Sequence, residues 1–182
     1  MESLNQAEAG ILLWTQENLR TEWLDHVMPY VSKINNSGIL AILAVIVLVA
    51  WSRYRKVGLT AFASLGVEFI IVNLLLKPNV ERTRPFIVLD QLQLLGSVPT
   101  DFSFPSGHTG SAFAVATVML LCMPAKYGVT AVIVSALIAF SRLYNAAHYP
   151  TDVLTGMVIG ILTGVIASCI YKKYSKKHDL GE

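Results

Sequence analysis

The sequence predicts an all-α protein built as one polytopic bundle of transmembrane helices, and three observations support this. Apolar residues make up 54% of the 182 residues and charged residues only 14%, a balance typical of membrane proteins. The apolar residues gather in long runs that polar stretches separate. The length of the chain suits a single domain.

Five apolar runs are long enough, or nearly so, to cross a bilayer, which takes about 20 residues. They cover residues 34–51, 58–76, 109–123, 128–147 and 153–171. The third run is short and is expected to take extra length from its flanks. Because the bilayer interior holds no water, each segment must satisfy its own backbone polar groups, so each run is predicted to be a helix.

Residues 1–33 mix apolar side chains with charges and are too polar to span a bilayer. We interpret them as an amphipathic interfacial segment of one or two helices, with Trp14 and Trp23 at the depth of the lipid headgroups. Residues 34–182 then form the transmembrane bundle. The alternative is a sixth span within residues 5–33, which would place the N-terminus on the inner side.

The basic residues indicate how the bundle is oriented. Three lie within residues 53–56, Lys126 lies between the third and fourth runs, and four lysines lie within residues 172–177. Five spans place all of them on one side, which the positive-inside rule assigns to the cytoplasm. The loops 77–108 and 142–152 then face outward. Since no eukaryotic sorting signal is evident, we expect a bacterial plasma membrane.

The two outward loops carry polar residues at the ends of the predicted helices, where their positions are well fixed. These residues are Lys77, Arg84, Ser106, Gly107, His108, Arg142, His148 and Asp152. Guanidinium groups match the oxygens of a phosphate, and a lysine adds a point charge. A helix start adds free N–H groups and a positive dipole end. Together they indicate a site for a phosphoryl group, whose transfer depends on positioning and charge stabilisation.

Two histidines allow a division of roles in phosphoryl transfer. A neutral imidazole attacks phosphorus, and a protonated one releases the leaving oxygen. His148 is the better candidate for the nucleophile because Asp152, four residues later, is close enough to bond the far ring nitrogen. His108, at the predicted helix start, is then the general acid.

Three motifs resemble the three-part signature of the type 2 phosphatidic acid phosphatase family, which includes lipid phosphate phosphatases and vanadium haloperoxidases. They read Lys77-x6-Arg84-Pro85, Pro105-Ser106-Gly107-His108 and Ser141-Arg142-x5-His148-x3-Asp152. The resemblance implies a phosphatase that uses no metal or other cofactor and forms a phosphohistidine on His148, assisted by Asp152. It implies that His108 protonates the leaving group. It assigns phosphate binding to Lys77, Arg84, Ser106, Gly107 and Arg142. Members of the family commonly have six membrane helices, and this chain departs from that pattern in its first 33 residues.

By analogy with the family, the small size suits hydrolysis of undecaprenyl pyrophosphate to undecaprenyl phosphate, with the lipid tail among the helices. Phosphatidylglycerophosphate, phosphatidate and lipid A phosphates remain alternatives, as does a non-catalytic protein that binds or transports lipid phosphates. A haloperoxidase fits less well because those relatives are soluble. The net charge of +2 is too small to indicate a nucleic-acid partner. The oligomeric state is left open.

Some further residues are interpreted as having structural roles only, in packing or at the solvated surface. On an ideal helix Glu68 lies opposite Lys77, which favours a packing role over contact with a lipid. Gly156, Gly160 and Gly164 repeat every four residues, as at close helix contacts, and are expected to pack inside the bundle. The remaining loop charges are interpreted as solvated: Glu81, Arg82, Asp90 and Asp101.

Overall fold

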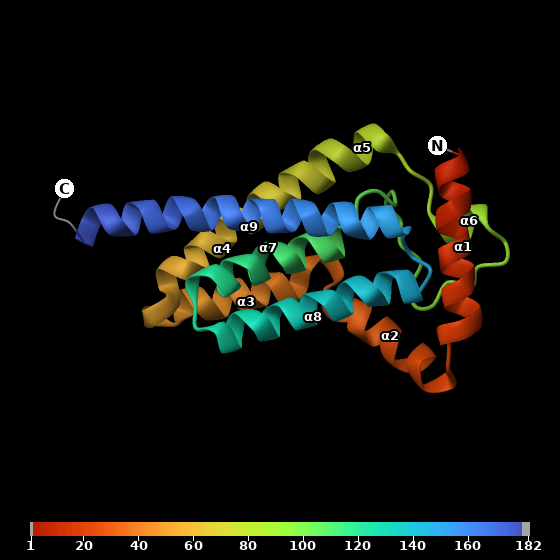
Figure 1. The fold of residues 1–182 in the computed structure, drawn as a ribbon, viewed down its shortest axis with the longest axis horizontal. Coiled ribbons are helices and arrows are strands. Elements are labelled where there is room, and N and C mark those ends of the chain that lie inside the picture. Colours follow the sequence, from red (N-terminus) through yellow and green to blue (C-terminus); the bar gives the residue numbers. More distant parts are fainter. Residues whose placement is uncertain (1, 180–182) are drawn as a thin grey trace.

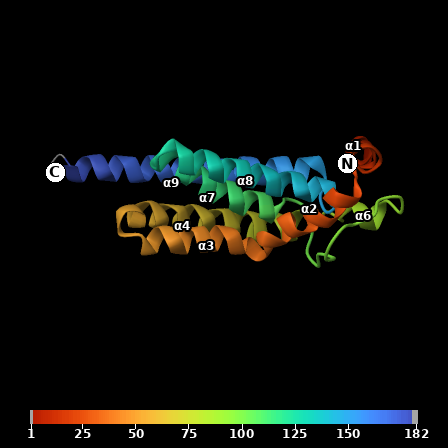
Figure 2. The same cartoon turned by 90° about the horizontal axis from the view of Figure 1, so that it is seen from below.

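The computed structural model describes residues 2–179, and over these residues it is helical and contains no strand. Most of the long helices run side by side, while one helix lies across the end of the bundle (Figures 1 and 2). In chain order they are α1 (Glu2–Leu19), α2 (Glu22–Ile34), α3 (Ile39–Ala50), α4 (Arg55–Phe69), α5 (Lys77–Val80), α6 (Pro85–Val88), α7 (Gly107–Cys122), α8 (Ala125–Tyr144) and α9 (Pro150–Asp179). Two 3-10 turns, Asn36–Gly38 and Ser52–Tyr54, and a π-helix, Ile70–Leu76, complete the helical elements.

The predicted fold class, an all-helical membrane protein, is confirmed. Among residues 2–179, three helical stretches are long and apolar enough to cross a bilayer: 52–88, α8 and 150–175. A fourth candidate is the pair formed by α2 and residues 36–50, bent by 40°. The helix α7 is apolar but shorter, as expected from its short run.

The first apolar run differs from its prediction because its helix begins five residues late. Ser37 and Gly38 both have positive φ, 52° and 72°, which interrupts the helix between Ile34 and Ile39. The last run differs at its other end, where α9 continues through the lysines to Asp179. The polar residues after Tyr171 therefore continue the helix beyond the length that crossing a bilayer requires, and this extension was not predicted.

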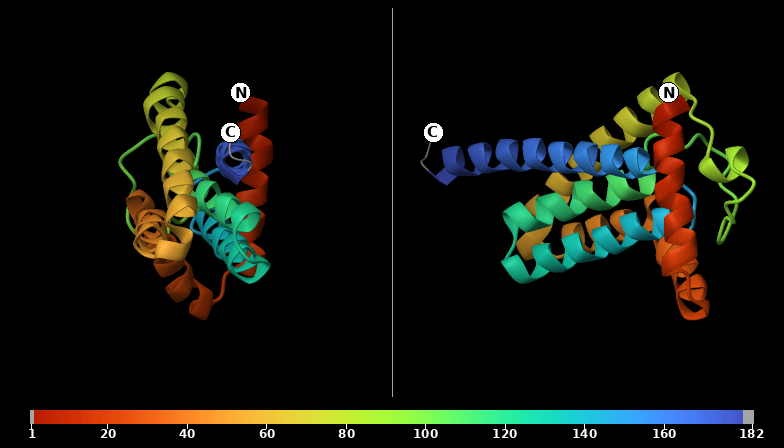
Figure 3. Two further views of the ribbon diagram at one scale, coloured as in Figure 1. Left: turned by 90° about the vertical axis from the view of Figure 1, so that its left-hand side faces the viewer. Right: turned by 45° about the vertical axis from the view of Figure 1, so that its right-hand side comes forward.

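The segment 1–33 contains α1 and most of α2, and the sequence predicted one or two helices there. Thr21 caps α2 by accepting a hydrogen bond from the N–H of Leu24, and Glu22 and Asp25 lie in its first turn, next to the positive end of the helix dipole. The helix α1 crosses the end of the bundle beside α8 and α9 (Figure 3). The placement of this segment in the membrane interface, and its separation from the bundle, stay predictions.

The helix α7 is the centre of the bundle and packs most extensively against α9. The glycines of α9 make this close approach possible, because a Cβ at Gly160 would overlap the carbonyl of Gly110 and one at Gly156 the carbonyl of Ser106. The predicted packing role of these glycines inside the bundle is confirmed. This contact between α7 and α9 brings the starts of the two helices together, and two of the polar motifs lie there.

Candidate active site

The polar motifs come together at the end of the bundle that lies farthest from the C-terminus. A pocket of about 670 Å³ opens there. Six of the eight predicted site residues line it: Lys77, Arg84, Gly107, His108, Arg142 and His148. The other two, Ser106 and Asp152, are fully buried behind the pocket wall.

The pocket side of His148 faces a guanidinium. Nη1 of Arg84 lies 3.2 Å from Nε2 of His148 and also donates to the carbonyl of Ala147 at 2.7 Å. A guanidinium can only donate, so Nε2 must accept with its lone pair, and the proton of a neutral ring is then on Nδ1. Nε2 is therefore the basic, nucleophilic nitrogen, and it borders the pocket.

The charge state of His148 follows from its surroundings. The ring is fully buried, and the positive charges of Arg142, Arg84 and Lys77 lie nearby; both effects hold the pKa of His148 well below its usual value. His148 is accordingly neutral at physiological pH, which is the state that an attack on phosphorus requires.

Asp152 lies on the other side of the ring, as predicted. Its Oδ2 is 3.5 Å from Nδ1 of His148, and this oxygen accepts shorter bonds from Ser103 Oγ at 2.5 Å and from the N–H of Tyr149 at 2.9 Å. Ser103 Oγ is itself 3.5 Å from Nδ1. The side chain of Ser103, which the sequence did not single out, therefore shares the position beside the ring.

The cations that line the pocket are only partly neutralised. Asp101 forms ion pairs with both Lys77 and Arg84, and although burial raises its pKa, these two partners hold that pKa well below the usual value. Arg142 donates from Nη1 to Ser32, and its buried Nε has no hydrogen-bond partner among the described residues. A buried donor left without an acceptor suits a site that receives an anion.

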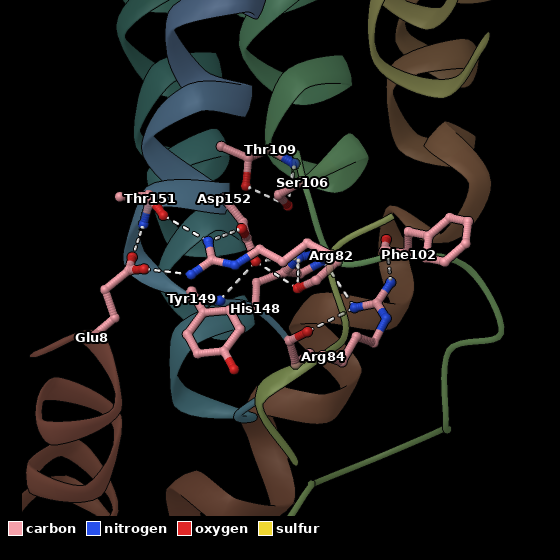
Figure 4. A network of polar contacts seen from close by, with 12 residues as sticks. Glu8, Arg82, Arg84, Phe102, Ser106, Thr109, His148, Tyr149, Thr151 and Asp152 are labelled. Carbon is pink, nitrogen blue, oxygen red and sulfur yellow. Dashed lines mark hydrogen bonds and ion pairs between the residues drawn. The ribbon is translucent and has the colours of Figure 1, made fainter. Parts of the chain in front are cut away.

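The start of α7 supplies the next part of the site. Ser106 is the N-cap: its Oγ accepts from the N–H of Thr109 and lies 3.0 Å from Oγ1 of Thr109 (Figure 4). Ser106 is buried and does not line the pocket, so in this structure it shapes the helix start, and its contact with phosphate stays a prediction. Nε2 of His108 bonds Oδ1 of Asn36 at 2.8 Å, a second partner that the sequence did not reveal.

The interpretation of Arg82 as a solvated loop charge was wrong, whereas Asp101 is exposed as expected but is also ion-paired. The Arg82 side chain is only 11% exposed and forms ion pairs with Glu8 and Asp152. Glu81 and Asp90 are exposed, as expected. The loop folds back over the motif residues, and no local pattern in the sequence signals this return.

The expected position of Glu68 was also wrong. Between Glu68 and Lys77 lies the π-helix Ile70–Leu76, whose wider turns rotate each residue less than an α-helix does, so the two side chains line the same pocket. Glu68 is buried against Gly110, and its Oε1 has no hydrogen-bond partner within residues 2–179. Whether it packs or contacts a lipid stays a prediction.

The pocket combines donors for an oxyanion with a neutral imidazole and an apolar extension. In the part of the chain that the structure describes, no three His, Cys, Asp or Glu side chains come together as a metal site. Ile42 of α3 and Phe62, Leu65 and Phe69 of α4 give part of the pocket an apolar lining. These features define a class: a helical membrane protein with a cationic pocket that also has apolar walls.

Comparison with known proteins gives the family. Residues 57–176 match the PAP2 superfamily, and the chain belongs to it. It is 30% identical to the undecaprenyl-diphosphatase of Sulfolobus acidocaldarius over 75% of this chain and 66% of that protein. It is 32% identical to the undecaprenyl-diphosphatase BcrC of Bacillus subtilis over 79% and 72%. The crystal structure of a PAP2-type phosphatidylglycerolphosphate phosphatase from Bacillus subtilis superposes with a TM-score of 0.79 at 27% identity, covering 95% of this chain and 88% of that one.

Proposed function

We propose that the protein is a metal-independent lipid phosphatase that hydrolyses undecaprenyl pyrophosphate to undecaprenyl phosphate through a phosphohistidine on His148. The observation that carries this proposal is the shape of one pocket. Its polar end holds Nε2 of His148 beside Arg84, and its other end is apolar between α3 and α4. Such a pocket fits a molecule that is a phosphate at one end and a hydrocarbon at the other.

The geometry suits an in-line transfer in two steps. Arg84 releases its hydrogen bond to Nε2 of His148, and the freed lone pair forms a bond to the terminal phosphorus while the bond from phosphorus to the bridging oxygen breaks. His108 gives a proton to the departing oxygen, and the positive charge on His148 is balanced by Asp152. A water molecule then attacks phosphorus, its proton returns to His108, and the N–P bond breaks to release inorganic phosphate.

The charge of the substrate supports these roles. An incoming phosphate brings negative charge to the three cations and favours the protonated form of His108. The attacking nitrogen stays neutral because Arg84 donates a hydrogen bond directly to it. The proposed roles need two charge states, a neutral His148 and a His108 that the bound phosphate protonates. Without phosphate, burial and the neighbouring Arg142, His148 and Lys77 lower the pKa of His108 as well.

The choice of the diphosphate rests on relatives. Two of them are named undecaprenyl-diphosphatases, and no residue in the pocket distinguishes one lipid tail from another. Phosphatidylglycerophosphate is the second candidate, because the superposed structure that covers 95% of this chain belongs to a phosphatidylglycerolphosphate phosphatase.

A phosphate-release assay on the purified protein tests the proposal. The substrates are C55 pyrophosphate, phosphatidylglycerophosphate, phosphatidate and diacylglycerol pyrophosphate, each with and without a chelator. We expect the highest kcat/KM for C55 pyrophosphate and no loss with the chelator. The substitution His148→Ala should lower the rate by roughly 10⁴-fold or more, since it removes the nucleophile.

The matched control for this assay is His26→Ala, which removes an exposed histidine that bonds only its own helix in the described contacts. That variant should keep full activity. A His148→Ala variant that still releases phosphate would exclude the proposed intermediate. A preference for phosphatidylglycerophosphate would leave the chemistry intact and replace the substrate.

We further propose that the site faces the outside of a bacterial plasma membrane. The support is the gathering of basic residues at the opposite end of the bundle. With Cys122 and Cys169 replaced by serine, a membrane-impermeant maleimide should label Asp90→Cys in intact cells. It should label Lys126→Cys only after permeabilisation. The reverse pattern would place the site inside.

A further inference from the structure

An ion-pair chain connects the N-terminal helix with Asp152. Oε2 of Glu8, on α1, lies 2.5 Å from Nη2 of Arg82, and Nη1 of Arg82 lies 2.6 Å from Oδ1 of Asp152. The three side chains are 5%, 11% and 0% exposed. Figure 4 shows Glu8, Arg82 and Asp152 in a row on one side of His148, with Arg84 on the other.

We propose that Glu8 and Arg82 are positioning residues for the phosphatase reaction: together they fix the carboxylate of Asp152 and leave its negative charge available to His148. The inference rests on the proposed function and gives α1, whose position in the sequence is remote from all three motifs, a role in the active site.

Hydrogen bonds to both oxygens of Asp152 fix the orientation of its carboxylate. Arg82 occupies Oδ1 of Asp152, while Ser103 and the backbone of Tyr149 occupy Oδ2, the oxygen nearest the imidazole. With donors on both oxygens the carboxylate plane cannot rotate freely, so the same oxygen always faces Nδ1 of His148. A fixed acceptor is what the ring needs when it becomes positively charged.

Arg82 itself is held on several sides. Its guanidinium carbon lies 3.9 Å from the centre of the Tyr149 ring, and Nη1 also donates to Oγ1 of Thr151 at 2.8 Å. Glu8 completes the enclosure and accepts from the N–H of Thr151 at 2.6 Å through its second oxygen. Glu8 therefore binds both Arg82 and the first turn of α9, the helix that carries Asp152.

The charges of Glu8 and Arg82 also affect how strongly Asp152 attracts a positively charged His148. Arg82 alone would neutralise Asp152 and weaken its attraction for the phosphorylated, positively charged His148. Glu8 compensates the charge of Arg82, so the described chain of Glu8, Arg82 and Asp152 carries two negative charges and one positive. In a buried site this net negative charge stabilises the positive ring that forms during the attack.

The test is a kinetic double-mutant cycle on the full-length protein with the preferred substrate. Glu8→Gln keeps the shape of the side chain and removes its charge, and we expect kcat to fall about tenfold with KM within about twofold. The formation of acid-labile phosphohistidine in single-turnover experiments should slow by the same factor. Glu17→Gln, the same substitution at an exposed position of α1, should leave kcat unchanged.

The second arm of the cycle separates positioning from simple anchoring of α1. Arg82→Met should lower kcat more than Glu8→Gln does, and adding Glu8→Gln to it should cause no further loss, because Glu8 acts through Arg82. Arg82→Lys should behave like Arg82→Met, since an ammonium cannot bridge both carboxylates in the same plane. In the double variant the side chains at positions 8 and 82 are both neutral and Asp152 keeps its hydrogen bonds from Ser103 and Tyr149, so the comparison with Arg82→Met remains informative if Glu8→Gln alone does not fold.

The outcomes are distinguishable from a failure of the proposed function. If His148→Ala abolishes turnover while Glu8→Gln keeps the wild-type kcat, the positioning role is overturned and the phosphatase stands. Additive losses in the cycle, with kcat and melting temperature falling together, would equally overturn it. If His148→Ala retains turnover, the proposed function itself fails.

Discussion

The imidazole of His148 has a pocket side and a rear side, and the two carry opposite net charge. Among the described residues, the pocket side holds three cations, Lys77, Arg84 and Arg142, against two acidic side chains, Asp101 and Glu68. The rear side holds the three-residue chain introduced above, with two carboxylates and one guanidinium.

This difference follows the charge that the proposed reaction develops on each side. The pocket side has an excess of positive charge for an anionic phosphate, and the rear side has an excess of negative charge for the ring that becomes cationic. Arg82 and Arg84 are separated by one residue and contribute to opposite sides. The position of an arginine in the loop therefore does not reveal its role, whereas its partners do.

The largest effect should follow from breaking the pocket side. Arg84→Met removes the donor next to Nε2 of His148 and one third of the positive charge, and kcat/KM should fall roughly 10²- to 10³-fold, as when an oxyanion donor is lost. Both kcat and KM should change, whereas rear-side variants change kcat alone. Steady-state phosphate release measures this.

Two results would qualify the comparison. Arg84→Lys keeps the charge without the planar fork and should recover only part of the loss. If Arg84→Met changed kcat alone, by the same factor as Arg82→Met, the two sides would not differ in their contact with the substrate. The contrast drawn here would then be wrong.

The sequence predicted the pocket side far better than the rear side. The residues of the pocket side belong to compact motifs whose types and spacing reflect phosphate chemistry, and Lys77, Arg84 and Arg142 line the pocket as expected. Glu8 and Arg82 are 74 positions apart and meet only because α1 crosses the end of the bundle. Pairing over such a distance depends on tertiary structure and leaves no periodic or local signal.

The fold shows the same division between local and tertiary causes. Apolar runs became helices because a bilayer requires it, so the fold class was predicted correctly. The interruption at Ser37 and Gly38 and the π-helix Ile70–Leu76 were not predicted, because neither changes the apolar composition of its run. The π-helix matters for the site, since it turns Glu68 into the pocket.

A smaller effect should appear in the pH dependence and would sharpen the comparison. Burial and the charges of Arg142, Arg84 and Lys77 lower the pKa of His148, so the wild-type nucleophile stays neutral as the pH falls below the usual histidine value. A histidine with a pKa of about 6.5 would be roughly 90% protonated at pH 5.5 and would lose about tenfold in rate. The wild type should not show this loss.

Removing Arg84 takes away one of the charges that disfavour the protonated ring, so the pKa of His148 rises in Arg84→Met and the loss of rate begins at higher pH. The ratio of wild-type to variant kcat/KM should therefore grow as the pH falls from 7 to 5.5, by up to about tenfold. Ionisation of the substrate affects both proteins equally and cancels in this ratio. Arg82→Met leaves the pocket-side charges in place, so the ratio for this variant should change less with pH than the ratio for Arg84→Met. A constant ratio for Arg84→Met would show that pocket-side cations bind phosphate without setting the charge of the nucleophile.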